Sequence, residues 1–332
     1  MILPTTHRAF TWQGSADPAD LQLTESPIPK PEAGDLLIRN VVIGLNPVDW
    51  KVLGGDLVNW QPGHVPGVDG AGVVVAVGDG VPTAWVGQRV AYHQHLARHG
   101  SFAEYTPVKA RAVVRIPADV SWESAASLPC PALTAWLALE KLPASCKTLL
   151  VSGAGGSVAN HLIQLAVRRG MRVTTLSNLR HMGRLAGLGV VECKKGPLTS
   201  AWKKPEQFDA VIDTVNAQHA AWLVPSLRAN GHLVCVQDRL ATSPIPPFTR
   251  TISIHEVALG ASHAFGDDRT WRELVDAGEQ ILTSLGRDQW APDTFNVAPF
   301  EQLADHLRGL KHRTFSGKGL VRISGNQLES HL

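Results

Sequence analysis

The sequence predicts an α/β protein of two domains, in which a doubly wound parallel sheet interrupts a β-rich chain. Three observations predict this architecture. The length of 332 residues exceeds that of a typical single domain. Roughly the first 115 residues contain short apolar runs broken by Gly, Pro and Asp, as in β-rich domains. From Thr148 onwards, strand-like and helix-like segments alternate, and this alternation indicates a parallel sheet with helices on both faces.

The β-rich part is predicted from apolar runs that end at turn residues. DLLIRNVVIGL (35–45) and AGVVVAVG (71–78) are rich in branched apolar residues, as strands are. The tail SGKGLVRIS (316–324) predicts one final strand. Both ends of the chain therefore contribute strands.

The middle part is predicted element by element. Thr148–Ser152 is a short buried-strand pattern, and the apolar residues after it recur at helical spacing until Gly170 provides a stop. The predicted order is strand 148–152, helix 157–169, strand 172–176, helix 180–189, strand 208–213, helix 219–231 and strand 232–236.

Composition and charge exclude several functional classes. The net charge of +2 is too small to indicate binding to nucleic acid or to an anionic membrane surface. No apolar run approaches the roughly 20 residues of a membrane span, and the N-terminal MILPTTHRAF lacks the pattern of a secretory signal. The cysteines form no C-x-x-C pair, which predicts a reducing, cytoplasmic location. They are Cys130, Cys146, Cys193 and Cys235.

A glycine cluster precedes the first helix of the middle part. VSGAGGSVA contains Gly153, Gly155, Gly156 and Ala159. Small residues between a buried strand and a helix allow a tight turn and let the backbone approach a pyrophosphate, while the helix N-terminus supplies free N–H groups. A glycine-rich turn without a ligand is the alternative. The surrounding alternation favours a dinucleotide-binding turn.

The residues after the next strand bear on which nicotinamide cofactor is bound. A carboxylate at this place would bind the ribose hydroxyls and repel a 2′-phosphate. The sequence TLSNLRHMGR instead offers Ser177, Asn178, Arg180, His181 and Arg184. Hydroxyl, amide and guanidinium groups suit a phosphate. The segment therefore favours NADPH over NADH, the alternative being a solvated basic helix start.

Further motifs follow one another along nearly the whole chain. They are GLNPVDWK, HVPGVDGAGVVVAVG, VGQRVA, GSFAEY, IPADVSWESAASLPCPALTAW, the glycine cluster, FDAVIDTV, NGHLVCV and SGKGLV. Together and in this order, they resemble the zinc-independent branch of the medium-chain dehydrogenase/reductase family, the quinone and enone oxidoreductases. The resemblance implies a GroES-like β-rich catalytic domain, a Rossmann domain inserted into it, and an active site in the cleft between them. The implied bounds are 1–121 and 267–332 for the GroES-like domain and 122–266 for the Rossmann domain.

The resemblance also bears on the catalytic residues. Where zinc-dependent relatives have a cysteine and a histidine ligand, this chain has Asn46 and Val68, which implies a reaction without zinc. A side-chain donor must then meet the charge that hydride transfer pushes onto a carbonyl oxygen. Lys51 is the first candidate, and Asn46 is expected to donate to the same oxygen or to hold the nicotinamide carboxamide. Asp49 is expected to orient Lys51 or stabilise the loop, and its alternative role is to cap the helical turn that follows. Tyr92 is an alternative proton donor.

Three histidines and one cysteine are further candidates for metal binding or nucleophilic chemistry. His93, His95 and His99 could bind zinc, but no carboxylate or cysteine completes the set, so a surface or cleft-lining role is favoured. Cys130, between two prolines, is expected to be a small packing residue rather than a nucleophile.

The resemblance places two residues outside the glycine turn beside the cofactor, Thr134 in PALTAW and Lys318 in SGKG. The expected cofactor-binding residues are Thr134, Gly153, Ala154, Gly155, Gly156, Ser157, Val158, Ser177, Asn178, Arg180, Val215, Val236 and Lys318.

The function expected from these observations is the NADPH-dependent, zinc-free reduction of quinones or α,β-unsaturated carbonyls. The alternative is an NADP(H)-binding sensor, structural protein or partner subunit with little turnover. The resemblance also implies a homodimer, and TISIHEVALG (251–260) is a plausible edge strand for its interface.

Overall fold

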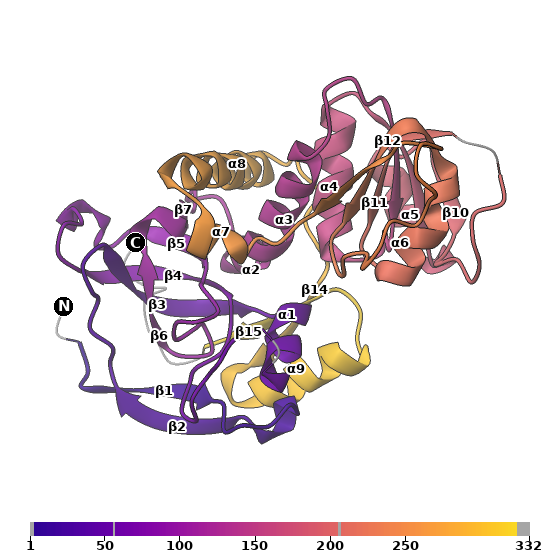
Figure 1. The fold of residues 1–332 in the computed structure, drawn as a ribbon. Coiled ribbons are helices and arrows are strands. Elements are labelled where there is room, and N and C mark those ends of the chain that lie inside the picture. Colours follow the sequence, from indigo (N-terminus) through magenta and orange to yellow (C-terminus); the bar gives the residue numbers. More distant parts are fainter. Residues whose placement is uncertain (1–2, 56, 205–206, 324–332) are drawn as a thin grey trace. The chain divides into compact units, whose positions relative to one another are not determined.

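The computed structural model describes residues 3–55, 57–204 and 207–323 (Figure 1). The chain forms two units: Met1–Cys130 with Ser262–Leu332, here called the β-domain, and Pro131–Ala261, here called the α/β-domain. The resemblance implied boundaries at 121/122 and 266/267, whereas the chain passes between the two units at 130/131 and 261/262. The helix α2 (Trp122–Ser127) packs on strands of the β-domain and belongs to it. Both crossings lie inside helices, α3 (Pro129–Glu140) and α7 (Ala261–Phe265).

The α/β-domain contains a six-stranded sheet whose neighbouring strands are all parallel, in the order β10-β9-β8-β11-β12-β13. The chain builds outward from β8 on one side and then returns to β11 on the other. In such doubly wound sheets the reversal opens a crevice at the carboxyl ends of the two central strands. The predicted fold class is thus confirmed. The strands are β8 (Thr148–Ser152), β9 (Arg172–Ser177), β10 (Glu192–Lys195), β11 (Phe208–Asp213), β12 (Leu227–Cys235) and β13 (Ser253–Glu256).

Helices cover this sheet and bury an apolar core. The helix after the glycine cluster runs over Ser157–Arg168, as its apolar spacing predicts, and Leu162, Ile163 and Ala166 are fully buried in the core. Gly170, at φ +75°, ends it in the left-handed region that favours glycine. The helical elements are α4 (Ser157–Arg168), η5 (Leu179–His181), α5 (Met182–Gly187), α6 (Ala217–Leu223) and η6 (Val224–Ser226).

One predicted helix of this domain was wrong in its second half. The sequence predicted a helix over 219–231, but α6 ends at Leu223 and β12 begins at Leu227. Pro225 explains the early end, because proline has no N–H to continue the helical ladder. Asn230, at φ 59°, lies in the left-handed region, within the stretch where the register between β12 and β11 shifts.

The β-domain contains a seven-stranded sheet in the order β14-β15-β3-β4-β5-β7, with β6 also paired to β3, and a separate β1–β2 hairpin. The C-terminal β15 pairs antiparallel with β3, so the tail completes a sheet that the N-terminal part began. The strands are β1 (Thr6–Thr11), β2 (Gln22–Pro27), β3 (Asp35–Gly44), β4 (Asp69–Val77), β5 (Arg89–His93), β6 (Tyr105–Lys109), β7 (Val113–Arg115), β14 (Phe295–Pro299) and β15 (Lys318–Arg322).

Helical elements flank the β-domain sheet. The longest, α8, spans 19 residues. In the described parts of the chain, no helix has both the length and the apolar character needed to cross a bilayer. The elements are η1 (Pro18–Asp20), α1 (Pro47–Lys51), η2 (Val52–Gly54), η3 (Thr83–Trp85), η4 (Ala110–Ala112), α2 (Trp122–Ser127), α8 (Asp268–Gly286), η7 (Phe300–Gln302) and α9 (Leu303–His312).

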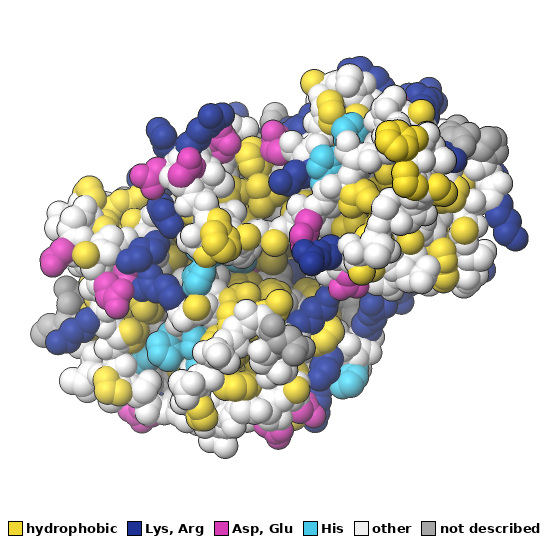
Figure 2. All heavy atoms as spheres, in the orientation of Figure 1, with side chains coloured by type: hydrophobic (Ala, Val, Ile, Leu, Met, Phe, Trp, Pro, Cys, Tyr) yellow, Lys and Arg dark blue, Asp and Glu magenta, His cyan; other side chains and the backbone are white. Residues whose placement is uncertain are grey.

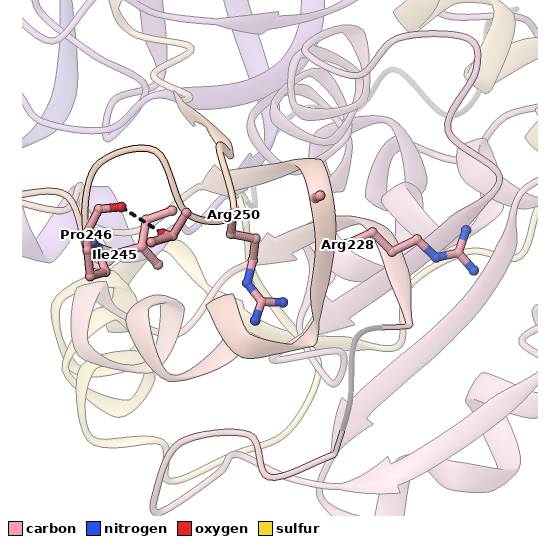
Figure 3. Close-up of a pocket in the computed structure, with 6 residues that line it drawn as sticks. Arg228, Ile245, Pro246 and Arg250 are labelled. Atoms are coloured by element: carbon pink, nitrogen blue, oxygen red, sulfur yellow. Dashed lines mark hydrogen bonds between the residues drawn. The ribbon is translucent and has the colours of Figure 1, made fainter.

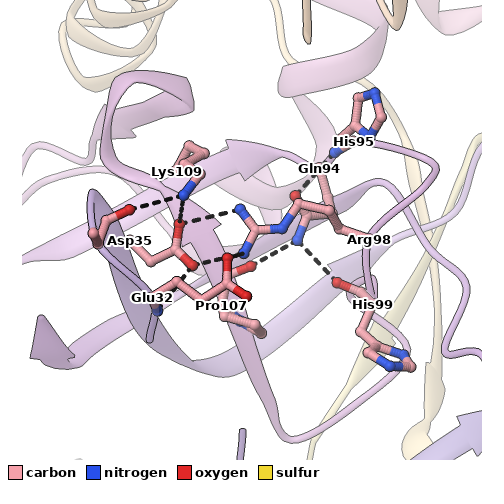
Figure 4. Close-up of polar contacts among 9 residues, drawn as sticks. Glu32, Asp35, Gln94, His95, Arg98, His99, Pro107 and Lys109 are labelled. Carbon is pink, nitrogen blue, oxygen red and sulfur yellow. Dashed lines mark hydrogen bonds and ion pairs between the residues drawn. The ribbon is translucent and has the colours of Figure 1, made fainter. Parts of the chain in front are cut away.

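A buried ion-pair network fixes the loop between β5 and β6 (Figure 4). The fully buried carboxylate of Asp35 accepts bonds from Arg98 at 2.6 and 3.1 Å and lies 2.8 Å from the Lys109 Nζ. Gln94 donates to the carbonyl oxygen of His99 at 2.9 Å. Burial alone would raise the pKa of Asp35, but the two cations outweigh it and lower the pKa. The network thus holds Asp35 ionised inside the domain.

The charges on the molecular surface are mixed. On the face shown in Figure 2, Lys and Arg side chains lie scattered among acidic and apolar ones. This distribution matches the small net charge of +2 and differs from the basic stripe of a nucleic-acid-binding face.

Candidate functional site

The first part of the candidate site follows β3, where the chain enters the short helix α1. Asp49 in α1 is fully buried. One of its carboxylate oxygens accepts the Asn46 N–H at 2.7 Å, and the other accepts the Val68 N–H at 3.1 Å. Asp49 therefore caps the turn and ties it to the segment before β4. Of the roles that the sequence left open for Asp49, these contacts support the cap.

A second buried group joins Asn46 to distant segments. Lys318, at the start of β15, donates from Nζ to the Asn46 Oδ1 at 2.5 Å. The Asn46 Nδ2 donates to Asp69 Oδ2 at 2.8 Å, and the Lys318 Nζ lies 3.5 Å from the same oxygen. Asp69 also accepts the backbone N–H of Cys130 at 3.0 and 3.1 Å. The exposed fractions are 3% for Asn46, 0% for Asp69 and 4% for Lys318.

The network's carboxyl groups are displaced from their ordinary titration range. Burial raises the pKa of Asp49 to about 7, and the nearby charge of Asp69 adds to this rise. Burial likewise raises the pKa of Asp69 to about 6, although the Lys318 ammonium and the bond from Asn46 oppose it. Lys318 forms its ion pair with Asp69, and its charge also opposes the rise in the pKa of Asp49.

Two of the expected catalytic residues lie outside this network. Lys51 is exposed at the end of α1, with Nζ 5.9 Å from the centre of the Trp50 ring. Tyr92 is fully buried in β5, and its hydroxyl donates to the Asn40 Oδ1 at 2.8 Å. Burial raises the pKa of the Tyr92 phenol further above its ordinary value. This placement gives Tyr92 a packing and hydrogen-bonding role inside the β-domain instead of that of a proton donor to substrate.

The three candidate histidines, His93, His95 and His99, contact different partners. The His93 Nδ1 lies 3.0 Å from the His263 Nε2, and the His263 ring also meets His95 edge-on. His99 stacks on His64 and accepts the Val65 N–H through Nδ1 at 3.1 Å. Burial lowers the pKa of His93 to about 3, so its ring is neutral at physiological pH. His93 and His99 therefore do not converge on one point.

The second part of the candidate site is the glycine turn of the α/β-domain. Gly153, at φ +67°, begins the turn, and a Cβ on it would approach the Thr214 Oγ1 to 2.3 Å. A Cβ on Gly155 would lie 2.6 Å from the ring of His181. Gly156 forms the N-cap of α4 without a side-chain cap, so the first N–H groups of that helix stay open to an anion.

Basic and polar side chains at the end of β9 flank this turn. The Arg184 guanidinium donates to the Asn160 Oδ1 at 2.8 Å and to the Gly155 carbonyl oxygen at 3.2 Å. The Arg180 Nε donates to the His181 Nε2 at 3.1 Å. Among the described residues, none hydrogen-bonds the buried hydroxyl of Ser177. A phosphate ester with several acceptor oxygens fits this combination of donors.

The remaining expected cofactor residues of the α/β-domain lie directly after strands or within a helix. Val215 comes after β11 and Val236 after β12, at the same carboxyl edge of the sheet as the glycine turn. Thr134 lies in α3 and is buried. Asp213, at the end of β11, accepts the Val215 N–H at 3.0 Å and the His219 Nδ1 at 2.6 Å. The parallel sheet therefore brings residues far apart in sequence to one edge.

A cavity of about 670 Å³ opens elsewhere on the α/β-domain (Figure 3). It lies at the amino end of β12, whereas ligands of such sheets bind at the carboxyl ends. Arg228 is paired with Asp209 at 3.0 Å, and Arg250 donates to the Leu227 carbonyl oxygen. None of the expected cofactor-binding residues lines this cavity. Its lining is Arg228, Ala229, Ile245, Pro246, Thr249 and Arg250.

Asp69 is the functional candidate that the sequence analysis did not assign. It is an acid between apolar residues in HVPGVDGAGVVVAVG, at the first position of a buried strand. A carboxylate at such a place needs hydrogen-bond donors or a cation. That local signal pointed to a buried polar partner, but it did not reveal that the partners are Asn46, Cys130 and Lys318.

This chain is similar in sequence and in fold to known oxidoreductases. The alcohol dehydrogenase GroES-like domain model matches residues 32–118. A chloroplast envelope quinone oxidoreductase homolog of Arabidopsis thaliana is 32% identical over 65% of this chain and 70% of its own. A trans-enoyl reductase of Penicillium citrinum is 29% identical over 96% of this chain and 98% of its own length. The structure of a mycobacterial quinone oxidoreductase superposes with a TM-score of 0.78 at 25% identity, over 95% of this chain and 99% of that one.

Proposed function

Because the chain belongs to the zinc-independent quinone and enone reductase branch of the medium-chain dehydrogenase/reductase family, we propose that it reduces quinones or α,β-unsaturated carbonyls with NADPH. An oxidoreductase role on a small molecule, with a nicotinamide cofactor, is common to this branch. The choice of NADPH and of the acceptor class is the proposal.

The main observation that supports NADPH binding is the glycine turn with its basic flank. The turn begins at Gly153, after the central strand β8, and leads into the uncapped start of α4. The loop after β9 presents Asn178 and Arg180 where a carboxylate would favour NADH. The buried hydroxyl of Ser177 adds a donor at the same strand end. These groups suit the pyrophosphate and a 2′-phosphate.

The β-domain supplies the groups that the reaction needs. A bound NADPH would supply the hydride. The ammonium of Lys51, exposed at the end of α1, would stabilise the negative charge that grows on the acceptor oxygen and return a proton to it. Asn46 and Lys318 form a buried donor–acceptor pair behind α1. Lys51 is therefore the proposed contact with the acceptor, and Asn46 and Lys318 are proposed to serve the reaction beside the nicotinamide of the cofactor.

The donor set at the metal-ligand positions supports a reaction without zinc. Val68 has an apolar side chain, and the Asn46 oxygen already accepts a bond from the Lys318 ammonium. A catalytic zinc site needs three strong protein ligands. An ammonium thus stands beside the position where zinc-dependent relatives bring a thiolate.

Steady-state kinetics test the proposal. NADPH consumption is followed with a panel of quinones and enones, for the wild type and for Lys51→Ala. We expect turnover with at least one acceptor class and a loss of roughly 100-fold or more in kcat for Lys51→Ala, since one removed donor to an oxyanion costs about 10²–10³. Lys311→Ala is the matched control, because the Lys311 Nζ also lies 5.9 Å from the Trp50 ring centre.

The same experiment separates the enzyme from a protein that only binds the cofactor. Tight NADPH binding without turnover on any acceptor would indicate a sensor or partner subunit. Turnover that Lys51→Ala and Lys311→Ala change equally would contradict the proposed role of Lys51.

A homodimer through the edge of the α/β-domain is part of the proposal. β13 is the edge strand of its sheet, and Ile254 in β13 is 41% exposed, while Phe248 in the preceding loop is 99% exposed. Unpaired strand edges with apolar side chains invite pairing. We expect a dimeric mass by light scattering that Ile254→Lys lowers, whereas Val86→Lys, at a 49% exposed position of the β-domain, leaves it unchanged.

A cytoplasmic location is likewise proposed, and a fluorescent fusion tests it.

A further inference from the structure

Asp69 connects three separate segments of the β-domain. Its carboxylate accepts the Asn46 Nδ2 at 2.8 Å, from the start of α1, and the Cys130 N–H at 3.0 and 3.1 Å, from the start of α3. The Lys318 Nζ, from the start of β15, lies 3.5 Å away. Asp69 is fully buried, so water does not compete for these bonds.

The chemistry of the partners determines which way the Asn46 amide faces. A carboxylate only accepts hydrogen bonds and an ammonium only donates them. The Asn46 NH₂ therefore faces Asp69, and its oxygen faces the Lys318 Nζ at 2.5 Å. A flipped amide would set its NH₂ against the ammonium and its oxygen against the carboxylate. Asp69 and Lys318 thus select a single orientation of Asn46, which also lets Nδ2 donate to the Gly44 carbonyl oxygen at 3.4 Å.

The same contacts keep Lys318 in place. A buried ammonium is unfavourable unless a counter-charge and hydrogen-bond acceptors surround it. Asp69 is its ion-pair partner at 3.5 Å, and Asn46 is its hydrogen-bond acceptor. Replacing the Asp69 carboxylate by an amide removes the counter-charge of Lys318. The amide oxygen can still occupy the Oδ2 position that Asn46 and Lys318 face, but its NH₂ group then meets the Cys130 N–H, a donor against a donor.

We propose that Asp69 is a positioning residue, which orients the Asn46 amide and holds the Lys318 ammonium in the geometry that turnover requires. This inference rests on the proposed function, in which Asn46 and Lys318 serve the reaction. Asp69 acts through these two side chains and needs no contact with substrate or cofactor.

Kinetics of Asp69→Asn test the inference, with Asp35→Asn as the matched control. Asp35 is an equally buried carboxylate of the β-domain, but its partners are Arg98 and Lys109. We expect Asp69→Asn to lower kcat at least tenfold while KM for the acceptor changes less than threefold. Asp35→Asn should keep kcat within twofold. Equal effects of the two variants on kcat would overturn the inference.

An NMR measurement tests whether Asp69 orients the Asn46 amide, independently of enzymatic activity. In ¹H–¹⁵N correlation spectra, the side-chain NH₂ signals of Asn46 are assigned by their loss in Asn46→Asp. We expect Asp69→Asn to shift them strongly and Asp35→Asn to leave them in place. Unchanged Asn46 signals in Asp69→Asn would overturn the inference, even if kcat falls.

The two readouts keep this inference distinct from the proposed function. A wild type without turnover on any acceptor defeats the proposed reaction, whereas the Asn46 signals still report whether Asp69 orients the amide. If Asp69→Asn does not fold, Asp69→Glu provides the comparison, because it keeps the charge and displaces the carboxylate by one carbon–carbon bond. Wild-type kcat and wild-type Asn46 signals in Asp69→Glu would then overturn the inference.

Discussion

Lys318 donates a hydrogen bond to the Asn46 side-chain oxygen, 2.5 Å away, although 272 positions separate the two residues in the chain. The pairing of β15 with β3 brings them together. The ammonium of a residue near the C-terminus therefore stands beside the position at which zinc-dependent relatives place a cysteine ligand.

Removal of this ammonium is expected to destabilise the β-domain. Lys318→Met leaves Asp69 buried without its cation and should lower the free energy of unfolding by about 3–5 kcal/mol. Lys109→Met is the control, because Asp35 keeps Arg98 as a partner. Urea denaturation measures both. If Lys318→Met loses no more stability than Lys109→Met, Lys318 does not neutralise the buried network.

The raised pKa of Asp49 predicts a distinct pH dependence of stability. Its pKa is 3.8 ordinarily and about 7 in the folded protein, so between these values the folded state binds more protons and stability falls as the pH rises. Asp49→Asn lacks this titration. The stability difference between wild type and Asp49→Asn should be largest at acidic pH and shrink toward pH 7, by at most about 1.4 kcal/mol per pH unit. A difference that stays constant with pH contradicts the assignment.

Asp35 is expected to show the opposite pH dependence. Arg98 and Lys109 lower its pKa below 3.8, so its stabilising contribution is present above that value and is lost as the pH falls through the folded-state pKa. Asp35→Asn should cost roughly 2–3 kcal/mol at neutral pH, because it weakens charged hydrogen bonds. Unfolding curves recorded from neutral to acidic pH should show wild type and variant converging; parallel curves would argue against the ion pair.

The basic flank of the glycine turn predicts cofactor preference. Arg180→Ala should weaken NADPH binding by roughly 10- to 100-fold, since a charge-assisted bond contributes about 1.5–3 kcal/mol. NADH binding should change less than threefold. Isothermal titration measures both affinities, and Arg228→Ala serves as a control because that arginine is paired with Asp209. Equal losses for the two cofactors would place the 2′-phosphate elsewhere.

Chelation tests the metal-free assignment. Because Val68 cannot ligate a metal and the Asn46 oxygen accepts a bond from Lys318, prolonged treatment with a strong chelator should leave kcat unchanged. Metal analysis of the purified protein accompanies the assay. One equivalent of zinc, lost together with activity and restored with it, would refute a zinc-free reaction.

Local signals predicted most elements of the α/β-domain. The strand over Thr148–Ser152 and the helix from Ser157 followed from apolar spacing and the glycine stop, and both are confirmed. The predicted helix over 219–231 was wrong after Leu223. Pro225 was visible in the sequence, but apolar residues continue past it, and only pairing with β11 shows that they form a strand.

The expected site residues were predicted less completely. Asn46, Asp49 and Lys318 do come together, but Asp69, which joins two of them, was not assigned. Tyr92 carries the right functional group for a proton donor, yet its burial and its bond to Asn40 follow from packing. A residue type alone does not reveal whether its side chain faces solvent or the core.

The sequence by itself determined the alternation of strands and helices, the glycine turn with its basic flank, and the absence of ligating side chains at positions 46 and 68. The alternation and the glycine turn follow from spacing and residue type over short segments, whereas the significance of positions 46 and 68 follows from the resemblance to the family. Only the tertiary structure decided that Lys318 would be buried against Asn46 and Asp69. That contact requires the last strand to pair with the first long strand of the sheet, and such distant pairing depends on the packing of the whole domain.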